Sequence, residues 1–150
     1  MRFALDSNIL VYSRVREDHR HAAALDLIRR SAQADCILPV QVLGEFLNVV
    51  RRKLPRSFDE ACTHAERLKT LMPVVETRAD VMLLAARRTR PHGLQFWDSV
   101  LCEVVRSAGG EVLLSEDMQD GRELDGLRIV NPFAAQNESQ VAELLISAEA

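Results

Sequence analysis

The sequence predicts an α/β protein, a three-layer α/β/α arrangement with a central parallel sheet of about five strands. Two observations indicate this fold class. Short apolar runs recur along the chain, and segments of helical length with apolar periodicity or capping signals separate them. Parallel neighbours need crossover connections, which helices supply, and right-handed crossovers restrict the topology. We expect the strand order 3-2-1-4-5.

The first expected strand, Phe3–Leu5, lacks the alternation of a half-exposed strand, so it suits a central position covered on both faces. It ends on a carboxylate, Asp6. The fourth strand, Glu111–Ser115, repeats this pattern and is followed by the acidic segment 116–120. The remaining expected strands are Cys36–Leu38, Val74–Val75 and Leu127–Val130.

The segments between these strands predict helices. A helix over Val40–Lys53 places four apolar residues on one face, with Glu45 beside that stripe. Ser57 with Glu60 forms a capping-box pattern, which predicts a helix running to Leu71. The apolar stripe consists of Val40, Leu43, Leu47 and Val50. The other expected helices are 8–13, 19–32, about 80–92 and about 96–108, and a C-terminal helix is an open option.

Length and composition indicate one globular domain. The chain has 150 residues, 47% of them hydrophobic and 27% charged, and no apolar run approaches the length of a membrane span. We therefore expect a cytoplasmic protein with no membrane association. The three cysteines are odd in number and widely spaced, which suggests neither a disulfide framework nor a zinc site and favours buried small hydrophobes.

The net charge of −3 argues against a protein that binds nucleic acid through bulk positive charge. However, 17 of the 19 basic residues are arginines, which bind phosphate in a forked geometry. Two clusters of basic residues stand out, and each either lies at a solvated helix end or binds RNA and directs it to the acids. The candidate RNA-contacting residues in them are Arg51, Arg52, Arg87 and Arg88.

Four acids are expected to meet at one edge of the sheet. In the predicted strand order the first and fourth strands are neighbours, so Asp6 and Asp117 lie side by side beyond their carboxyl ends. Glu45 and Asp98 lie on helices that start at the same edge. Three of the acids have an ordinary alternative, because Asp6 and Asp98 can cap helices and Glu45 can be a surface acid.

Four carboxylates at close range repel one another, so such a group takes up protons or binds cations. The candidate ligands are all oxygens, which points to Mg²⁺ or Mn²⁺ rather than zinc or copper. A cation held in this way can activate water against a phosphodiester bond. Metal-assisted hydrolysis is the expected reaction.

In order and spacing, these motifs resemble the PIN domain, a family that includes the VapC-like toxin ribonucleases of toxin-antitoxin pairs. The resemblance covers residues 1–133 and leaves 134–150 as a C-terminal tail. The motifs that carry it are Asp6-Ser7-Asn8, Glu45 on a helix, Phe96-Trp97-Asp98 and Ser115-Glu116-Asp117.

The resemblance implies a magnesium- or manganese-dependent ribonuclease, often dimeric and often inhibited by an antitoxin protein. It implies Asp6, Glu45, Asp98 and Asp117 as catalytic metal ligands. Two features depart from the pattern, Met118 where an aromatic residue is frequent and the long tail. Supporting roles fall to the polar residues near these acids, Ser7, Asn8, Ser115 and Asp120.

Other functions fit less well. A haloacid-dehalogenase-type phosphatase needs an acid where Asn8 stands, and a phospho-receiver needs a late lysine that the chain lacks. The glycine-rich fingerprints of nucleotide-binding folds are absent from the sequence. The remaining alternative is a non-catalytic PIN-like module that binds RNA or a protein.

Overall fold

The computed structural model describes residues 1–146 of the chain; residues 147–150 lie outside this range. Its sheet has the strand order β3-β2-β1-β4-β6-β5. The five expected strands form in the expected order, with β6 in the fifth place. The strands are β1 (Phe3–Leu5), β2 (Cys36–Pro39), β3 (Val74–Val75), β4 (Val112–Leu114), β5 (Glu123–Leu124) and β6 (Leu127–Val130).

The number of strands differs from the prediction, because the sheet has six strands rather than five. The additional strand, β5, pairs antiparallel with β6 through a two-residue turn at Asp125 and Gly126. Both turn residues have positive φ, 50° and 91°. Asp-Gly is a strong signal for such a hairpin, and the prediction of a purely parallel sheet overlooked it.

The pairing of β1 with β4 brings two distant parts of the sequence to one edge. The strands run parallel, with Phe3 beside Val112 and Leu5 beside Leu114. The backbone N–H of Asp6 donates to the carbonyl of Leu114 at 2.9 Å, which continues the ladder by one residue. Asp6 and the loop after β4 therefore leave the sheet at the same point.

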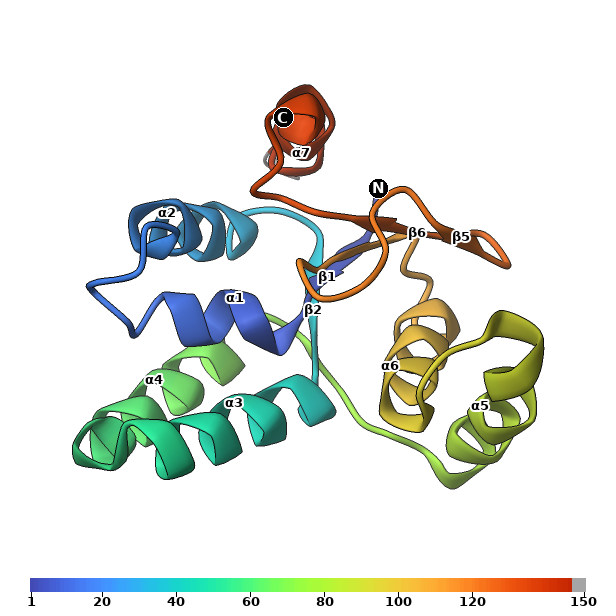
Figure 1. Cartoon of the computed structure of the whole chain (residues 1–150), viewed down its shortest axis with the longest axis horizontal. Coiled ribbons are helices and arrows are strands. Elements are labelled where there is room, and N and C mark those ends of the chain that lie inside the picture. The colour runs from blue at the N-terminus through green and yellow to red at the C-terminus, as the bar shows by residue number, and fades with distance from the viewer. Residues whose placement is uncertain (147–150) are drawn as a thin grey trace.

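Helices cover both sides of this sheet, and Figure 1 shows α1 to α4 together on one side of β1 and β2, with α5 and α6 together on the other. Gly93, in the left-handed conformation, ends α5 as a C-cap. The helices are α1 (Ser7–Tyr12), α2 (His21–Ser31), α3 (Val40–Lys53), α4 (Phe58–Leu71), α5 (Ala79–His92), α6 (Phe96–Ser107) and α7 (Glu138–Leu144), with short 3₁₀ turns η1 (Pro55–Ser57) and η2 (Ala135–Asn137).

The bounds of α3 match the prediction, but its buried face does not. Val42, Phe46 and Val50 are the buried residues, spaced four apart, whereas Val40 is 43% exposed. The helix packs between α1 and α4, so its neighbours on two sides decide which stripe is buried. Because the buried face of α3 differs from the predicted one, Glu45 lies on a half-buried flank of the helix that faces α1.

The predicted capping box at Ser57 is also wrong. Ser57 belongs to η1 and its side chain makes no capping hydrogen bond to α4. Pro55 starts this 3₁₀ turn, so the chain enters α4 already coiled and the backbone of Ser57 is not extended as a cap requires.

The C-terminal helix that the sequence left open is present as α7. Val141, Leu144 and Leu145 are buried and join the main hydrophobic core. Cys36 and Cys102 are also buried in that core, as expected of small hydrophobes, and the three cysteines are free thiols. No helix within residues 1–146 is both long and apolar enough to cross a membrane.

Candidate active site

Asp6 lies at the junction of β1 and α1 and is almost fully buried, 5% exposed. Its Oδ1 accepts the backbone N–H of Ser7 at 2.7 Å, so it does cap α1. Its Oδ2 accepts the hydroxyl of Ser115 at 2.7 Å. Burial raises the pKa of Asp6 to about 6, and the charges of Glu45 and Asp117 contribute to this rise. Capping therefore occupies only one oxygen of a carboxylate held in an acidic environment.

Glu45 projects from α3 toward the same region. Its Oε2 accepts the hydroxyl of Ser7 at 3.0 Å, and its Oε1 accepts the amide of Gln41 at 2.7 Å. The Gln41 amide also donates to the backbone carbonyl of Trp97 at 2.9 Å. Gln41 thus links Glu45 on α3 to the first turn of α6, where Asp98 lies.

Gln41 is a residue that the sequence analysis missed. Its i, i+4 spacing to Glu45 on a predicted helix was the available signal, because residues so spaced are neighbours on a helix surface. Its Oε1 is buried and has no hydrogen-bond partner among the described residues.

Asp98 lies in the first turn of α6 and is half-buried. Burial raises its pKa, and the charges of Glu45 and Asp117 add to the rise. Within residues 1–146 its carboxylate accepts no hydrogen bond. The side chain therefore does not cap α6, which was the ordinary alternative for Asp98. Asp98 is therefore free to bind a ligand.

The fourth acid, Asp117, is held by Asn8 of α1. The Asn8 amide donates to Asp117 Oδ2 at 3.2 Å and lies 3.5 Å from the hydroxyl of Ser115. The Asn8 carbonyl oxygen accepts the backbone N–H of Glu116 at 3.4 Å. One asparagine therefore fixes three successive residues of the loop after β4.

The four acids lie close enough to affect one another electrostatically. The charges of Glu45 and Asp117 act on Asp6, and the same two charges act on Asp98. Their hydrogen bonds come from neutral donors of Ser7, Gln41, Asn8 and Ser115. Within the described residues no lysine, arginine or histidine forms an ion pair with any of the four.

The donor set suits a hard divalent cation in its chemistry, since it consists of carboxylates with no soft ligand. The uncompensated charge also favours a cation. The side-chain positions do not form a ready-made cage, because across residues 1–146 no three acid, imidazole or thiol groups converge closely enough to hold one metal ion.

Other predicted site residues lie elsewhere. The Asp120 carboxylate accepts the backbone N–H of Asn131 at 2.8 Å and the amide of Asn137 at 3.0 Å, so it anchors the C-terminal segment. Among the predicted RNA contacts, Arg51, Arg52 and Arg87 are exposed, whereas Arg88 forms ion pairs with Glu103 and Asp125. Arg88 is therefore less available for phosphate than the other three.

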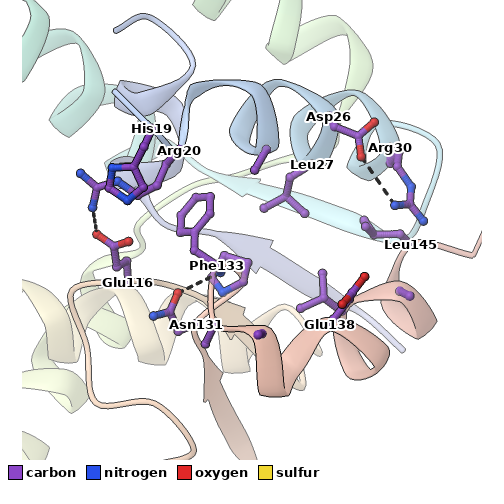
Figure 2. Close-up of a pocket in the computed structure, with 16 residues that line it drawn as sticks. His19, Arg20, Asp26, Leu27, Arg30, Glu116, Asn131, Phe133, Glu138 and Leu145 are labelled. Atoms are coloured by element: carbon purple, nitrogen blue, oxygen red, sulfur yellow. Dashed lines mark hydrogen bonds and ion pairs between the residues drawn. The ribbon is translucent and has the colours of Figure 1, made fainter. Parts of the chain in front are cut away.

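A groove of about 600 Å³ lies between α2 and the segment that leads into α7. Figure 2 shows Arg20 and Glu116 bonded to each other at one end, and Glu138 and Leu145 at the other. Leu27 and Phe133 supply apolar walls. Glu116 directly precedes Asp117, so this end of the groove adjoins the acidic group.

Comparison with solved structures gives similar folds at low sequence identity. VapC20 from Mycobacterium tuberculosis, described as a sarcin-ricin loop cleaving toxin, is 22% identical with a TM-score of 0.63, over 77% of this chain and 89% of that one. PAE2754 from Pyrobaculum aerophilum is 18% identical with a TM-score of 0.64, over 96% and 95%. VapBC2 from Rickettsia felis, bound to promoter DNA, is 14% identical with a TM-score of 0.63, over 87% and 98%.

No curated protein matches the sequence. The sequence model of one family, the PIN domain, matches residues 3–126. This range contains β1 to β5 and all four acids, so it covers most of the chain. The protein belongs to the PIN domain family.

Proposed function

We propose that this protein is a metal-dependent endoribonuclease that hydrolyses RNA phosphodiester bonds with Mg²⁺ or Mn²⁺. The observation that carries the proposal is the group of four mutually interacting carboxylates with no cationic partner within the described residues. Nuclease chemistry is consistent with the family. The proposed metal ligands are Asp6, Glu45, Asp98 and Asp117.

The chain's own groups orient the proposed ligands. The Ser115 hydroxyl and the Ser7 N–H each bind one oxygen of Asp6, and Gln41 and the Ser7 hydroxyl hold Glu45. When bound, a divalent cation would supply Lewis-acid stabilisation of the charge that develops on the phosphate. Polar side chains that fix ligand orientation typically contribute about 10- to 100-fold in metal affinity.

We further propose that the protein is the toxin of a toxin-antitoxin pair, with an antitoxin protein as its partner, and that it acts on RNA in the cytoplasm. The similarity to VapC20 and to VapBC complexes supports this role. Because VapC20 is described as a toxin that cleaves the sarcin-ricin loop, an RNA with that loop is the first substrate to try.

We propose a homodimer on the basis of apolar side chains that α5 and the start of α6 leave uncovered. Leu83 is 68% exposed, Trp97 55% and Leu84 42%, in a helix pair where Ala85 is the buried residue of α5. Exposed apolar patches of this kind mark protein interfaces. Sedimentation of the wild type and of Leu83→Glu tests the dimer, which the charged variant is expected to dissociate.

The first test of the metal site is Mn²⁺ binding by calorimetry, comparing the wild type with Asp98→Asn in the absence of antitoxin. We expect saturable binding by the wild type and clearly weaker binding by the variant, because the Asp98 carboxylate has no hydrogen-bond or ion-pair partner within residues 1–146. Asp120→Asn is the matched control, since its carboxylate bonds Asn131 and Asn137 instead. Absence of binding by the wild type would overturn the metal site and favour the non-catalytic module.

Cleavage is tested on a sarcin-ricin loop RNA and on total RNA, with Mn²⁺ or Mg²⁺ and with EDTA as the control. Cut ends that require the cation and vanish in Asp98→Asn are the expected result. The same RNA tests the basic cluster at the end of α3. The double variant Arg51→Ala with Arg52→Ala should bind RNA more weakly with a smaller salt dependence, and an unchanged salt dependence would exclude these arginines.

A further inference from the structure

Glu116 lies between Ser115, which donates to Asp6, and Asp117 of the acidic group, yet its own side chain is directed to the corner between α1 and α2. The hydroxyl of Tyr12 donates to Glu116 Oε1 at 2.7 Å, and the Arg20 guanidinium donates to the same oxygen. Figure 2 shows the Arg20 contact at the end of the groove. One oxygen of Glu116 therefore receives two donors from outside the acidic group.

Arg20 is itself held in place from two directions. Its Nε and Nη2 donate to the two oxygens of Asp18, each at 2.8 Å, and its guanidinium carbon lies 3.8 Å from the centre of the Tyr12 ring. A forked ion pair and stacking on an aromatic face are the geometries that fix an arginine best. With a side chain 23% exposed, Arg20 is a largely immobilised cation.

The loop after β4 is thus held on both sides. On one side Tyr12 and Arg20 bind the Glu116 carboxylate. On the other, Asn8 accepts the Glu116 backbone N–H at 3.4 Å and donates to Asp117 at 3.2 Å. These contacts place two adjacent acids in opposite surroundings, Glu116 beside a cation and Asp117 among carboxylates.

We propose that Arg20 and Tyr12 are positioning residues that hold Glu116 away from the acidic group and thereby fix Asp117 as the metal ligand of this loop. The inference rests on the proposed function and deepens it. Two neighbouring acids follow β4, and either could reach a cation if the loop were loose. Binding of Glu116 by Arg20 also holds a fifth carboxylate apart from the other four and so limits the repulsion among them.

A purely structural role is the competing explanation, since the same contacts tie α2 to the loop. A matched control exists in Arg14 and Glu60, an ion pair at 2.6 Å that joins α4 to the residues just after α1. It resembles the Arg20 contact in kind, but it has no connection to the four acids. Its loss should change stability alone.

The experiment compares Mn²⁺ affinity by calorimetry with thermal stability for Glu116→Ala, Arg20→Met, Tyr12→Phe and Glu60→Ala. We expect Glu116→Ala and Arg20→Met to weaken Mn²⁺ binding by about 10-fold, the lower end of the effect of groups that orient metal ligands. Tyr12→Phe should cause a smaller loss, because it removes one donor and leaves the ring that supports Arg20. Glu60→Ala should leave Mn²⁺ affinity unchanged.

The conservative variant Glu116→Gln sharpens the result. Glutamine keeps an oxygen that accepts from Tyr12 and Arg20, so Mn²⁺ affinity should stay near that of the wild type, as expected of a residue that is not a ligand. A loss in Glu116→Gln as large as that in Asp117→Asn would instead make Glu116 a ligand and overturn the inference.

Wild-type affinity in Glu116→Ala and Arg20→Met, with only a drop in melting temperature like that of Glu60→Ala, would also overturn the inference and assign these residues a structural role. That outcome leaves the proposed function standing. Failure of the wild type to bind Mn²⁺ overturns both the metal site and this inference, so the two failures are distinguishable. RNA cleavage adds a second readout, in which loss of kcat rather than a rise in KM is expected.

Discussion

Two buried carboxylates in this molecule differ in their partners, because one is paired with arginines and the other accepts hydrogen bonds from neutral groups. Glu103 on α6 is 4% exposed and receives Arg88 at 2.8 Å and Arg106 at 3.0 Å. Asp6 is 5% exposed, and among the described residues it accepts hydrogen bonds only from a hydroxyl and a backbone N–H. Burial of a charge is costly unless the charge is paired. The chain compensates Glu103 internally and leaves the charge of Asp6 to be compensated by something else.

The surroundings extend this contrast. Asp125, in the β5–β6 turn, joins the Glu103 network through Arg88 and also contacts His92 Nε2 at 3.0 Å, and the Arg106 side chain donates to its backbone carbonyl at 3.0 Å. This network joins α5 and α6 to the β5–β6 hairpin. Around Asp6, by contrast, the charged neighbours are further acids. One region therefore uses carboxylates for stability and the other keeps them available for a ligand.

The largest effect expected from this contrast is that of Asp6→Asn on RNA cleavage. Loss of a ligand should remove several kcal/mol of transition-state stabilisation, which corresponds to a fall in rate of about 100-fold or more. The same variant should be more stable than the wild type in EDTA, because it removes a buried charge. Since one unit of pKa is worth about 1.4 kcal/mol, the gain at neutral pH is on the order of 1–3 kcal/mol.

Thermal or chemical denaturation in EDTA and a cleavage assay measure both halves of this prediction. A variant that loses stability and activity together would remove the contrast, because Asp6 would then be no more than a structural cap.

Glu103→Gln should show the reverse pattern. The variant removes the ion pair of Arg106 with Glu103 and leaves Arg88 paired with Asp125. Since Arg88 and Arg106 are 30% and 23% exposed, we expect a loss of about 2 kcal/mol, below the full cost for buried pairs. Mn²⁺ affinity should not change. Denaturant unfolding gives the stability, and a change in Mn²⁺ affinity as large as that in Asp98→Asn would contradict the separation of the two regions.

Gln41→Leu tests the neutral donors that hold the uncompensated acids. It removes the hydrogen bonds to Glu45 and to the Trp97 carbonyl, so Glu45 should lose orientation and Mn²⁺ affinity should fall about 10-fold. Because these bonds are part-exposed, the loss of stability should be about 1 kcal/mol. Gln41→Glu is an informative companion, since a further negative charge at this position should destabilise the metal-free protein.

The smallest expected effect concerns His64, a half-buried base that lies near two cations. It packs edge-on against Phe46 of α3, its Nε2 has no hydrogen-bond partner among the described residues, and burial together with Arg14 and Arg67 lowers its pKa. Between its lowered pKa and 6.5 the unfolded chain binds more protons, so stability rises with pH in that window. Below 6.5 the protein should progressively lose stability.

His64→Gln should remove this component of the pH dependence. Melting temperatures of the wild type and the variant, measured from about pH 5 to pH 8 in EDTA, give the difference directly. Parallel curves for the two proteins would show that protonation of His64 carries no cost in the fold.

The sequence by itself determined the class of fold and the order of its strands. Unalternating apolar runs such as Phe3–Leu5 have to be covered on both faces, and parallel strands have to be joined by helices, so local pattern and connection rules suffice. The sequence also predicts where Asp6 and Asp117 lie, because residues that follow the carboxyl ends of two neighbouring parallel strands have little freedom to lie elsewhere. Glu45, in the second turn of α3, and Asp98, on a helix that follows α5, depend on how those helices pack.

Tertiary structure decided what depends on neighbours distant in sequence. The buried stripe of α3 depends on α1 and α4, and the failed cap at Ser57 depends on how the chain enters α4. Tyr12 and Arg20, which donate to Glu116, and Ser7, which donates to Glu45, lie far from these acids in the sequence and form no motif with them. Side-chain hydrogen bonds and ion pairs are directional and act over a few ångströms, so only the folded arrangement determines which carboxylate receives a cation and which does not.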